Sequence, residues 1–202
     1  MNNKNWTGNS NSIYKTLGAS NHTKEEREKN DFYATDPIAT EHLVYLEDIN
    51  KNVLDPCVGE GHLIQELVER GHDLTVMDII DRGYPNTKIQ NFLEWKGEFD
   101  GDIIMNPPYK YAKQFVEKSL EVISEGNKVY AFLKVQFLES VGRREIFKKT
   151  PPKTVYVSSS RITCAKNADF EKMKQSGGSA ACYCWYVWEK GYKGSTTLKW
   201  FN

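Results

Sequence analysis

Four consecutive residues, Asn106-Pro107-Pro108-Tyr109, combine an amide, two prolines and an aromatic ring. The Asn106 side chain and the Pro107 carbonyl provide two acceptors for one exocyclic amine, and the Tyr109 ring can stack on the planar group that bears this amine. The prolines restrict the backbone that presents these groups. The same run is compatible with a stiff loop after a strand, but its position downstream of two further motifs favours a binding site.

The segment from Asp55 to Gly61 lies where an apolar run gives way to a helical pattern. Gly59 and Gly61 allow a ligand to approach the backbone closely at the end of the expected strand. The dinucleotide fingerprint requires a third glycine where this chain has Ile64, which argues against a nicotinamide cofactor. Asp78 ends the next expected strand, where a carboxylate can accept hydrogen bonds from ribose hydroxyls. Together these residues predict a nucleoside site.

Strand and helix patterns alternate through the central part of the chain. Apolar runs predict strands at 53–55, 74–77, 88–90, 103–105 and 128–133, and helical spacing predicts helices after Pro37, at 63–71 and at 115–123. This alternation is typical of an α/β fold with a mostly parallel, doubly wound sheet. Near the end of the chain, 183–188 and 196–201 are expected to form an antiparallel pair of strands joined by a turn that contains glycine.

Length and composition limit the class of protein. The 202 residues fit one domain, and 27 basic against 27 acidic residues exclude a globally basic nucleic-acid coat. Hydrophobic residues make up 39%, which excludes wholesale disorder, and the longest apolar runs are far too short for a membrane span. The polar N-terminus has no signal-peptide core and the four cysteines have no framework spacing, so we expect a reducing cytoplasmic location.

The order of these motifs resembles that of the class I S-adenosylmethionine-dependent amino-methyltransferases, which have a Rossmann-like fold, and in particular the small N6-adenine DNA methyltransferases of phages and prophages. The run Asn106 to Tyr109 matches their catalytic motif, and Asp55 to Gly61 is similar to their Asp-Pro-x-x-Gly-x-Gly cofactor loop. Asp31 to Pro37 resembles, with inserted residues, the Phe-x-Thr-Pro-type segment that contacts the methionine part of the cofactor. Asn91-Phe92 takes the place of an Asp-Phe pair whose acid holds the adenine amine of the cofactor.

The resemblance implies direct transfer of a methyl group from S-adenosylmethionine to the N6 amine of adenine, with the target base flipped out of the DNA duplex. It implies catalytic roles for Asn106, Pro107, Pro108 and Tyr109. It implies cofactor contacts for Tyr33, Thr35, Asp55, Pro56, Gly59, Gly61, Asp78, Ile79, Asn91 and Phe92.

Recognition of DNA is expected late in the chain, because the motifs run without interruption from the cofactor loop to the catalytic run. Residues 1–30 are expected to form a flexible arm, and 31–202 one methyltransferase domain. Within this domain, 141–182 holds nine basic and three acidic residues and is the candidate recognition insert. Candidate phosphate contacts are Arg143, Arg144, Lys148 and Lys149, with Arg161 as a candidate reader of a base edge, although a charge run is also typical of a solvated helix face.

The remaining reactive residue types favour structural roles. The four histidines, at 22, 42, 62 and 72, share no ligand spacing, so we expect no metal. Cys182 and Cys184 have the spacing of one face of a strand and are expected in the core. Trp185, Trp188 and Trp200 are also expected in the core of the sheet.

Several alternatives are open at the level of sequence. The catalytic motif does not distinguish adenine N6 in DNA from adenine in RNA or from cytosine N4, whereas the short segment before Asp55 argues against a protein glutamine as the acceptor. A catalytically inactive DNA- or protein-binding factor with the same fold is a rival from another class. The sequence leaves open the recognised site, the need for a partner subunit, and whether the chain is a monomer or a homodimer.

Overall fold

The structure is a computed structural model that describes residues 33–166, 168, 170 and 181–201; the expected arm at 1–30 and residues 31 and 32 lie outside this part. The helices are α2 (Ile38–Leu46), α3 (Gln65–Glu69), α4 (Ala112–Val122) and α5 (Arg144–Lys149). The strands are β1 (Tyr33–Thr35), β2 (Asn52–Asp55), β3 (Asp73–Asp78), β4 (Lys88–Ile89), β5 (Asp102–Met105), β6 (Lys128–Lys134), β7 (Thr154–Ser158), β8 (Cys164–Lys166), β9 (Tyr183–Glu189) and β10 (Thr197–Phe201). Short 3₁₀ turns are η1 (His62–Ile64), η2 (Phe92–Glu94), η3 (Tyr109–Tyr111), η4 (Val135–Leu138) and η5 (Val141–Arg143).

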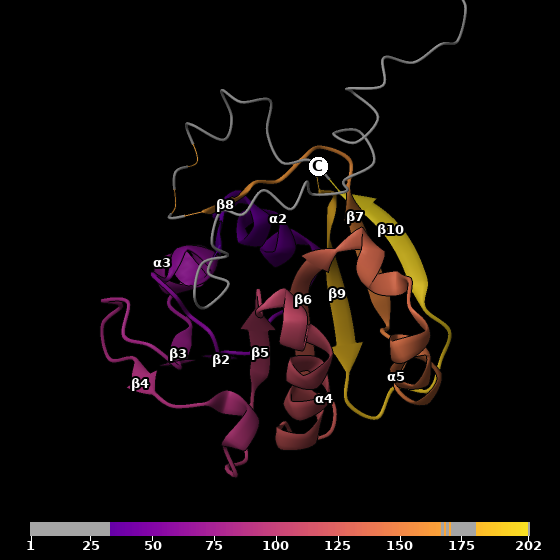
Figure 1. The fold of residues 1–202 in the computed structure, drawn as a ribbon, viewed down its shortest axis with the longest axis horizontal. Coiled ribbons are helices and arrows are strands. Elements are labelled where there is room, and N and C mark those ends of the chain that lie inside the picture. The colour runs from indigo at the N-terminus through magenta and orange to yellow at the C-terminus, as the bar shows by residue number, and fades with distance from the viewer. Residues whose placement is uncertain (1–32, 167, 169, 171–180, 202) are drawn as a thin grey trace, which may run out of the picture.

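Eight strands form one sheet in the order β10-β7-β9-β6-β5-β2-β3-β4, which runs from right to left in Figure 1. Five consecutive strands of this sheet are mutually parallel: β4, β3, β2, β5 and β6. Strand β9 is antiparallel to both of its neighbours, β6 and β7. This arrangement confirms the predicted α/β class with a mostly parallel sheet. Because the parallel strands point the same way, their carboxyl ends lie along one edge, where β1 and β8 form a separate antiparallel pair.

The predicted pairing of the last two strands is wrong. Both segments are strands, but β7 lies between them: β9 pairs antiparallel with β7, and β10 pairs parallel with the other side of β7. Residues Tyr183–Trp188 of β9 are all buried, as an inner strand requires, whereas β10 is exposed except at Phe201. The local turn signal favoured a hairpin because it could not show that a strand from earlier in the chain takes the inner position.

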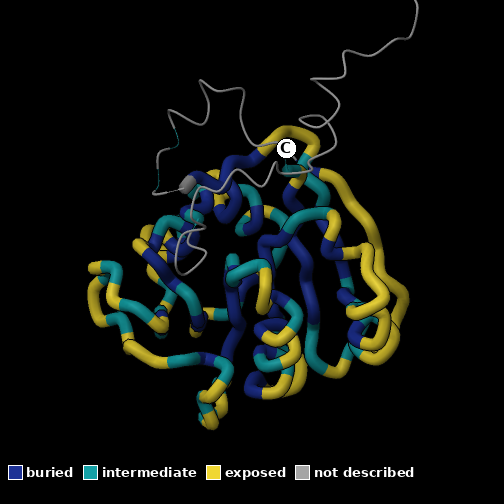
Figure 2. The backbone as a smooth tube through the Cα atoms, viewed as in Figure 1, coloured by how far each residue is buried: buried dark blue, intermediate teal, exposed yellow. Residues whose placement is uncertain are grey.

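Helices cover both faces of the sheet. Residues of α2 and α3 belong to the core cluster that contains Trp185, and residues of α4 and α5 belong to the cluster that contains Trp188. These two tryptophans are buried as predicted, and Figure 2 shows the inner strands as the buried part of the fold. Trp200 is instead 67% exposed, because it lies on the outer strand β10. Cys184 is buried as predicted, but Cys182, just before β9, is exposed. None of the helices in the described part of the chain is long and apolar enough to cross a membrane.

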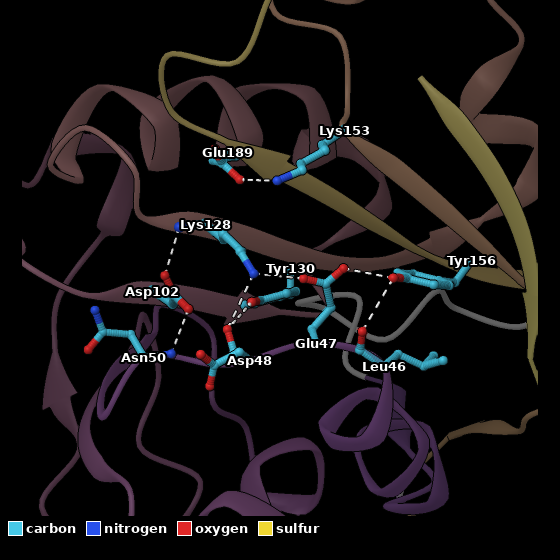
Figure 3. Close-up of polar contacts among 10 residues, drawn as sticks. All are labelled: Leu46, Glu47, Asp48, Asn50, Asp102, Lys128, Tyr130, Lys153, Tyr156 and Glu189. Atoms are coloured by element: carbon cyan, nitrogen blue, oxygen red, sulfur yellow. Dashed lines mark hydrogen bonds and ion pairs between the residues drawn. The ribbon is translucent and has the colours of Figure 1, made fainter. Parts of the chain in front are cut away.

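A polar cluster joins the end of α2 to the amino edge of the sheet (Figure 3). The Lys128 ammonium lies 2.8 Å from one carboxylate oxygen of Glu47, and the other oxygen accepts from the Tyr156 hydroxyl at 2.8 Å. Asp102 accepts from the backbone N–H groups of Asn50, at 2.8 Å, and Lys128, at 2.7 Å. These bonds hold the segment between α2 and β2 against the starts of β5 and β6, at the edge opposite the carboxyl ends.

Replacement of Lys128 by Met is expected to lower the free energy of unfolding by about 2–3 kcal/mol, because it leaves the Glu47 carboxylate half-buried without its cation. The Lys128 and Glu47 side chains are only 19% and 13% exposed. The matched control is Lys148→Met, which breaks an exposed pair with Glu145, at 57% and 63% exposure. We expect this control to change stability by less than about 1 kcal/mol. Equal losses in urea unfolding would contradict the assigned role of the buried pair.

Candidate functional site

A cavity of about 640 Å³ lies at the carboxyl ends of β2, β3 and β5, the edge at which sheets of this type bind ligands. The strand ends contribute Asp55, Asp78 and Asn106 to its lining. Residues of β1 and of the segment Gln90–Leu93 complete the wall. The volume is in the range of sites for small organic ligands. No group of three or more His, Cys, Asp or Glu side chains within the described residues is placed to hold a metal ion.

Two strand-end carboxylates shape the loop that follows β2. Asp55 Oδ1 accepts from the N–H of Cys57, and Asp78 Oδ2 accepts from the N–H of Gly59, each at 2.9 Å. Gly59 and Gly61 have φ angles of 58° and 85°, which glycine adopts without strain. The loop is therefore held in place before any ligand binds, with both carboxylates at the cavity wall.

The carboxyl group of Asp55 is costly to ionise. It is 1% exposed, and burial raises its pKa to about 7; the Cys57 N–H opposes this rise and the charge of Asp78 adds to it. A ligand with positive charge stabilises the ionised form of such a group, whereas an anionic ligand destabilises it further. The electrostatics of the cavity therefore favour a cationic ligand.

The side chain of Asn106 is hydrogen-bonded at its nitrogen, whereas its oxygen is buried without a hydrogen-bond partner among the described residues. Its Nδ2 donates to Thr35 Oγ1 at 2.8 Å and to the Tyr33 carbonyl at 3.4 Å. Its Oδ1 is buried and has no hydrogen-bond partner among the described residues. Buried acceptors are almost always paired in native proteins, so an unpaired one at a cavity indicates a place for a ligand donor.

The ring of Tyr109 lies within a group of aromatic and basic side chains. Its hydroxyl is hydrogen-bonded to the Tyr183 hydroxyl, and its ring centroid lies 5.9 Å from that of Tyr33, at an interplanar angle of 28°. The Lys134 ammonium lies 4.3 Å from the Tyr109 centroid. Tyr109 is thus fixed at its hydroxyl and covered by neighbours, and it is not among the described residues that line the cavity.

Solved structures identify the fold, although no family model and no curated protein matches the chain. A Listeria monocytogenes protein described as a class I S-adenosylmethionine-dependent methyltransferase matches with a TM-score of 0.59 and 14% identity, over 88% of this chain and 68% of its own. The chain has the class I methyltransferase fold. An Agrobacterium tumefaciens protein described as an O-methyltransferase matches with a TM-score of 0.52 and 11% identity, over 77% of this chain and 81% of its own.

Two proteins of restriction systems share the methyltransferase fold over part of their length. A type IIG restriction endonuclease matches with a TM-score of 0.50 and 14% identity, over 78% of this chain and 24% of its own. A protein of a type I restriction-modification system matches with a TM-score of 0.50 and 12% identity, over 75% of this chain and 40% of its own. At these identities the matches establish the fold, which is the one that the order of motifs implied.

The methyltransferase fold brings most of the predicted cofactor residues together. Tyr33, Thr35, Asp55, Pro56, Asp78, Ile79, Asn91 and Phe92 line the cavity, and Pro108 lines it with Asn106. Gly59 and Gly61 shape the loop behind the wall, and Pro107 is buried. Asn91 also caps η2: its Oδ1 accepts from the Leu93 N–H at 3.1 Å, and its Nδ2 donates to Glu94 at 2.9 Å. An amide oxygen can accept two hydrogen bonds, so Asn91 Oδ1 can accept a second one from a ligand.

Several polar residues of the lining were not indicated by the sequence. They are Glu60, His62, Arg82, Gln90, Lys110 and Tyr111. Lys110 and Tyr111 directly follow the run Asn106 to Tyr109, and Gln90 directly precedes Asn91, so extending each motif by two residues would have found them. Arg82 lies in an irregular segment after β3 and has no such signal.

Part of the basic stretch 141–182 belongs to the main sheet. The stretch contains α5 and the inner strand β7, and β8 pairs separately with β1; residues 167, 169 and 171–180 lie outside the described residues. Lys148 and Lys149 end α5 shortly before β7 begins, and Figure 1 shows α5 toward the edge opposite the strand tips. Arg144 starts α5 and Arg161 follows the end of β7. The fold therefore does not bring Lys148 and Lys149 to the cavity.

The guanidinium of Arg143 is used within the loop that follows β6. Its Nε donates to the Phe137 carbonyl at 2.7 Å, and its Nη2 donates to the carbonyls of Gln136, at 3.0 Å, and Glu139, at 2.5 Å. The same group lies 4.7 Å from the centroid of the Phe137 ring. These contacts assign Arg143 to holding η4 and η5 together, a role that sequence spacing alone could not distinguish from phosphate contact.

Substitution of Gly61 by Ala is expected to destabilise the cofactor loop of the methyltransferase fold. An added Cβ would overlap the Tyr84 ring, in addition to the strain of a φ of +85°. The control is Gly126→Ala, with the same φ of +85° and nothing within 4 Å of the added Cβ. We expect Gly126→Ala to cost about 1 kcal/mol and Gly61→Ala at least about 1 kcal/mol more in urea unfolding. If the two variants lose the same stability, the contact with Tyr84 is not restrictive.

Proposed function

We propose that this protein is an S-adenosylmethionine-dependent methyltransferase that methylates the exocyclic N6 amine of adenine in DNA. The observation that carries the proposal is the Asn106 amide at the cavity, whose buried Oδ1 has no partner among the described residues. An unpaired buried acceptor costs free energy until a ligand donor supplies the missing hydrogen bond. An exocyclic amine supplies two donors, one for Asn106 Oδ1 and one for the Pro107 carbonyl beside it, which favours an amine over a hydroxyl acceptor.

The residues of the cavity fit S-adenosylmethionine, which is a nucleoside with a positively charged sulfonium. Asp78 would accept from the ribose hydroxyls and Asn91 from the adenine amine, while Ile79 and Phe92 provide apolar contact for the ring. Asp55, whose pKa burial raises to about 7, gains from any positive charge bound nearby. When bound, the cofactor supplies an electrophilic methyl group to a nitrogen nucleophile.

The catalytic run prepares the acceptor nitrogen. The lone pair of an exocyclic amine is delocalised into the ring, so the nitrogen is a poor nucleophile. Hydrogen bonds to Asn106 Oδ1 and to the Pro107 carbonyl draw the nitrogen toward tetrahedral geometry and stabilise the positive charge that develops on it. An amide is not a base at neutral pH, so the surplus proton leaves to water after transfer.

DNA as the substrate is supported by two observations. Two of the structures that share this fold belong to restriction systems. In addition, exposed basic side chains lie on segments that follow strands at the carboxyl edge of the sheet: Lys110 in η3 and Arg161 after β7. Such side chains can neutralise phosphates on either side of a base that is flipped from the duplex into the cavity.

The state of the cysteines supports the predicted cytoplasmic location. All four are free thiols, and Cys164 and Cys184 are buried. Structural disulfides are typical of oxidising compartments and rare in the cytoplasm. A reducing compartment therefore suits the proposed enzyme.

The test is a transfer assay with radiolabelled S-adenosylmethionine on unmethylated DNA, total RNA and a release-factor-type protein, with the digested products separated. We expect label in N6-methyldeoxyadenosine with the wild type and none with Asn106→Ala. Label in cytosine N4, in RNA or in protein would overturn the substrate while keeping the chemistry. Absence of label from every acceptor, with cofactor binding intact by calorimetry, would support the rival function of a binding factor without turnover.

A further inference from the structure

We infer that Thr35 is a positioning residue for methyl transfer, because its hydroxyl, together with the Tyr33 carbonyl, holds the Asn106 amide in one orientation. The inference rests on the proposed function. It gives Thr35 a role different from the cofactor contact that the resemblance implies. A side-chain amide carries an acceptor oxygen and a donor nitrogen on one planar group, and a rotation of about 180° exchanges them. Only one of the two orientations offers the oxygen to a substrate amine.

Two groups on β1 hold the nitrogen side of the amide. The Thr35 Oγ1 accepts from Asn106 Nδ2 at 2.8 Å, and the Tyr33 carbonyl accepts from it at 3.4 Å. A carbonyl cannot donate, so the rotated amide would place its oxygen against the Tyr33 oxygen. The Tyr33 carbonyl therefore determines which way the amide faces, and the shorter bond to Thr35 holds the nitrogen in that place.

The Thr35 hydroxyl must act as an acceptor toward Asn106, and its surroundings favour this. Thr35 Oγ1 lies 3.9 Å from Cys164 Sγ, and burial raises the pKa of the Cys164 thiol to about 12, so the sulfur is uncharged. When the Thr35 hydroxyl directs its proton to the thiol sulfur, its oxygen lone pairs are available to Asn106 Nδ2. Thr35 and Cys164 are each 2% exposed, so water does not compete for these bonds.

The pairing of β1 with β8 sets this geometry. Thr35 and Cys164 are directly opposite each other in the antiparallel pair, so their side chains lie on the same face. They are 129 residues apart in the sequence, one before the cofactor loop and one after the inner strand β7. The orientation of the Asn106 amide therefore depends on a contact between two distant segments, beside the cavity that β1 lines.

The test compares Thr35→Val, which removes the hydroxyl at nearly constant volume, with Thr35→Ser, which keeps it. We expect kcat of Thr35→Val on the preferred DNA substrate to fall about 10- to 100-fold, while the cofactor Kd and the KM for DNA stay close to wild type. Thr35→Ser should recover most of the rate. A Thr35→Val variant with normal kcat and weakened cofactor binding would overturn the inference in favour of a direct cofactor contact.

A second measurement does not depend on turnover. In the NMR spectrum, the side-chain NH₂ of Asn106, identified by its loss in Asn106→Ala, should be protected from solvent exchange in the wild type and in Thr35→Ser. It should exchange faster in Thr35→Val and in the smaller Thr35→Ala. Unchanged protection in both variants would refute the role of Thr35, even if the wild type transferred no methyl group and the proposed function had itself failed.

Discussion

Replacement of Asp55 by Asn is expected to raise the melting temperature at pH 8 and, at the same time, to weaken cofactor binding about 100-fold. In the folded protein, burial raises the pKa of Asp55 from 3.8 to about 7. Between about pH 4 and 7 the folded protein therefore holds a proton that the unfolded chain has lost, so stability falls as pH rises through this window. Above pH 7 the ionised carboxylate costs on the order of a few kcal/mol, a cost that Asn avoids.

The pH dependence distinguishes this effect from a general stabilisation. By scanning calorimetry, the gain of Asp55→Asn should be largest at pH 8 and disappear near pH 4. The control is Asp102→Asn, because burial also raises the pKa of Asp102. Both oxygens of Asp102 accept backbone N–H groups, and an amide nitrogen cannot replace one of them. The control should therefore lose stability, and a loss for Asp55→Asn at pH 8 would contradict the assigned cost.

The same substitution removes the charge that a cationic cofactor would stabilise. We expect the Kd for S-adenosylmethionine, measured by calorimetry, to rise about 100-fold in Asp55→Asn. Wild-type binding should tighten between pH 6 and pH 8, as Asp55 ionises more readily, whereas binding to the variant should be flat over this range. S-adenosylhomocysteine, which lacks the sulfonium charge, should show a smaller difference. An unchanged Kd would show that the charge of Asp55 does not act on the ligand.

The sequence predicted those parts of the fold whose signals are local. Two strands are short apolar segments that end in an acid, Asp55 or Asp78. Asn106 directly follows a third apolar strand. Since parallel strands bring their carboxyl ends to one edge, the cavity could be expected from these three ends alone. The cavity at this edge, lined by all three residues, agrees with that expectation.

The parts that could not be predicted depend on contacts between distant segments. The strand at Thr154–Ser158 was hidden in a basic stretch, and its inner position changed the pairing of the last two strands. The pairing of Thr35 with Cys164 leaves no periodic signal in either segment. Arg143 has the sequence context of a phosphate contact, but three of its five N–H donors are directed to backbone carbonyls. Charge spacing shows which residues are basic and does not show what the fold places beside them.

Replacement of Asn106 by Asp is expected to make the rate of methyl transfer depend on pH. The variant should be active when the introduced carboxyl group is protonated. At high pH the second carboxylate oxygen would occupy the place of Nδ2, against the Tyr33 carbonyl oxygen that now lies 3.4 Å from this nitrogen. Two acceptors in contact repel, so the carboxylate turns away from the position that the amide holds. When protonated, the group has one donor and one acceptor, which is the pattern of the amide. The kcat of Asn106→Asp should therefore rise as the pH is lowered from 8 to 6.

The measurement is kcat on the DNA substrate at saturating S-adenosylmethionine, so that weaker cofactor binding at low pH does not enter. Asn106→Ala is the control, because it lacks both groups and should be about 100- to 1000-fold slower than wild type at every pH. The wild type, whose amide does not titrate, should show no rise toward low pH. If kcat of Asn106→Asp instead rises with pH, the acceptor amine prefers a charged oxygen, and the Tyr33 carbonyl does not determine how the side chain at position 106 faces.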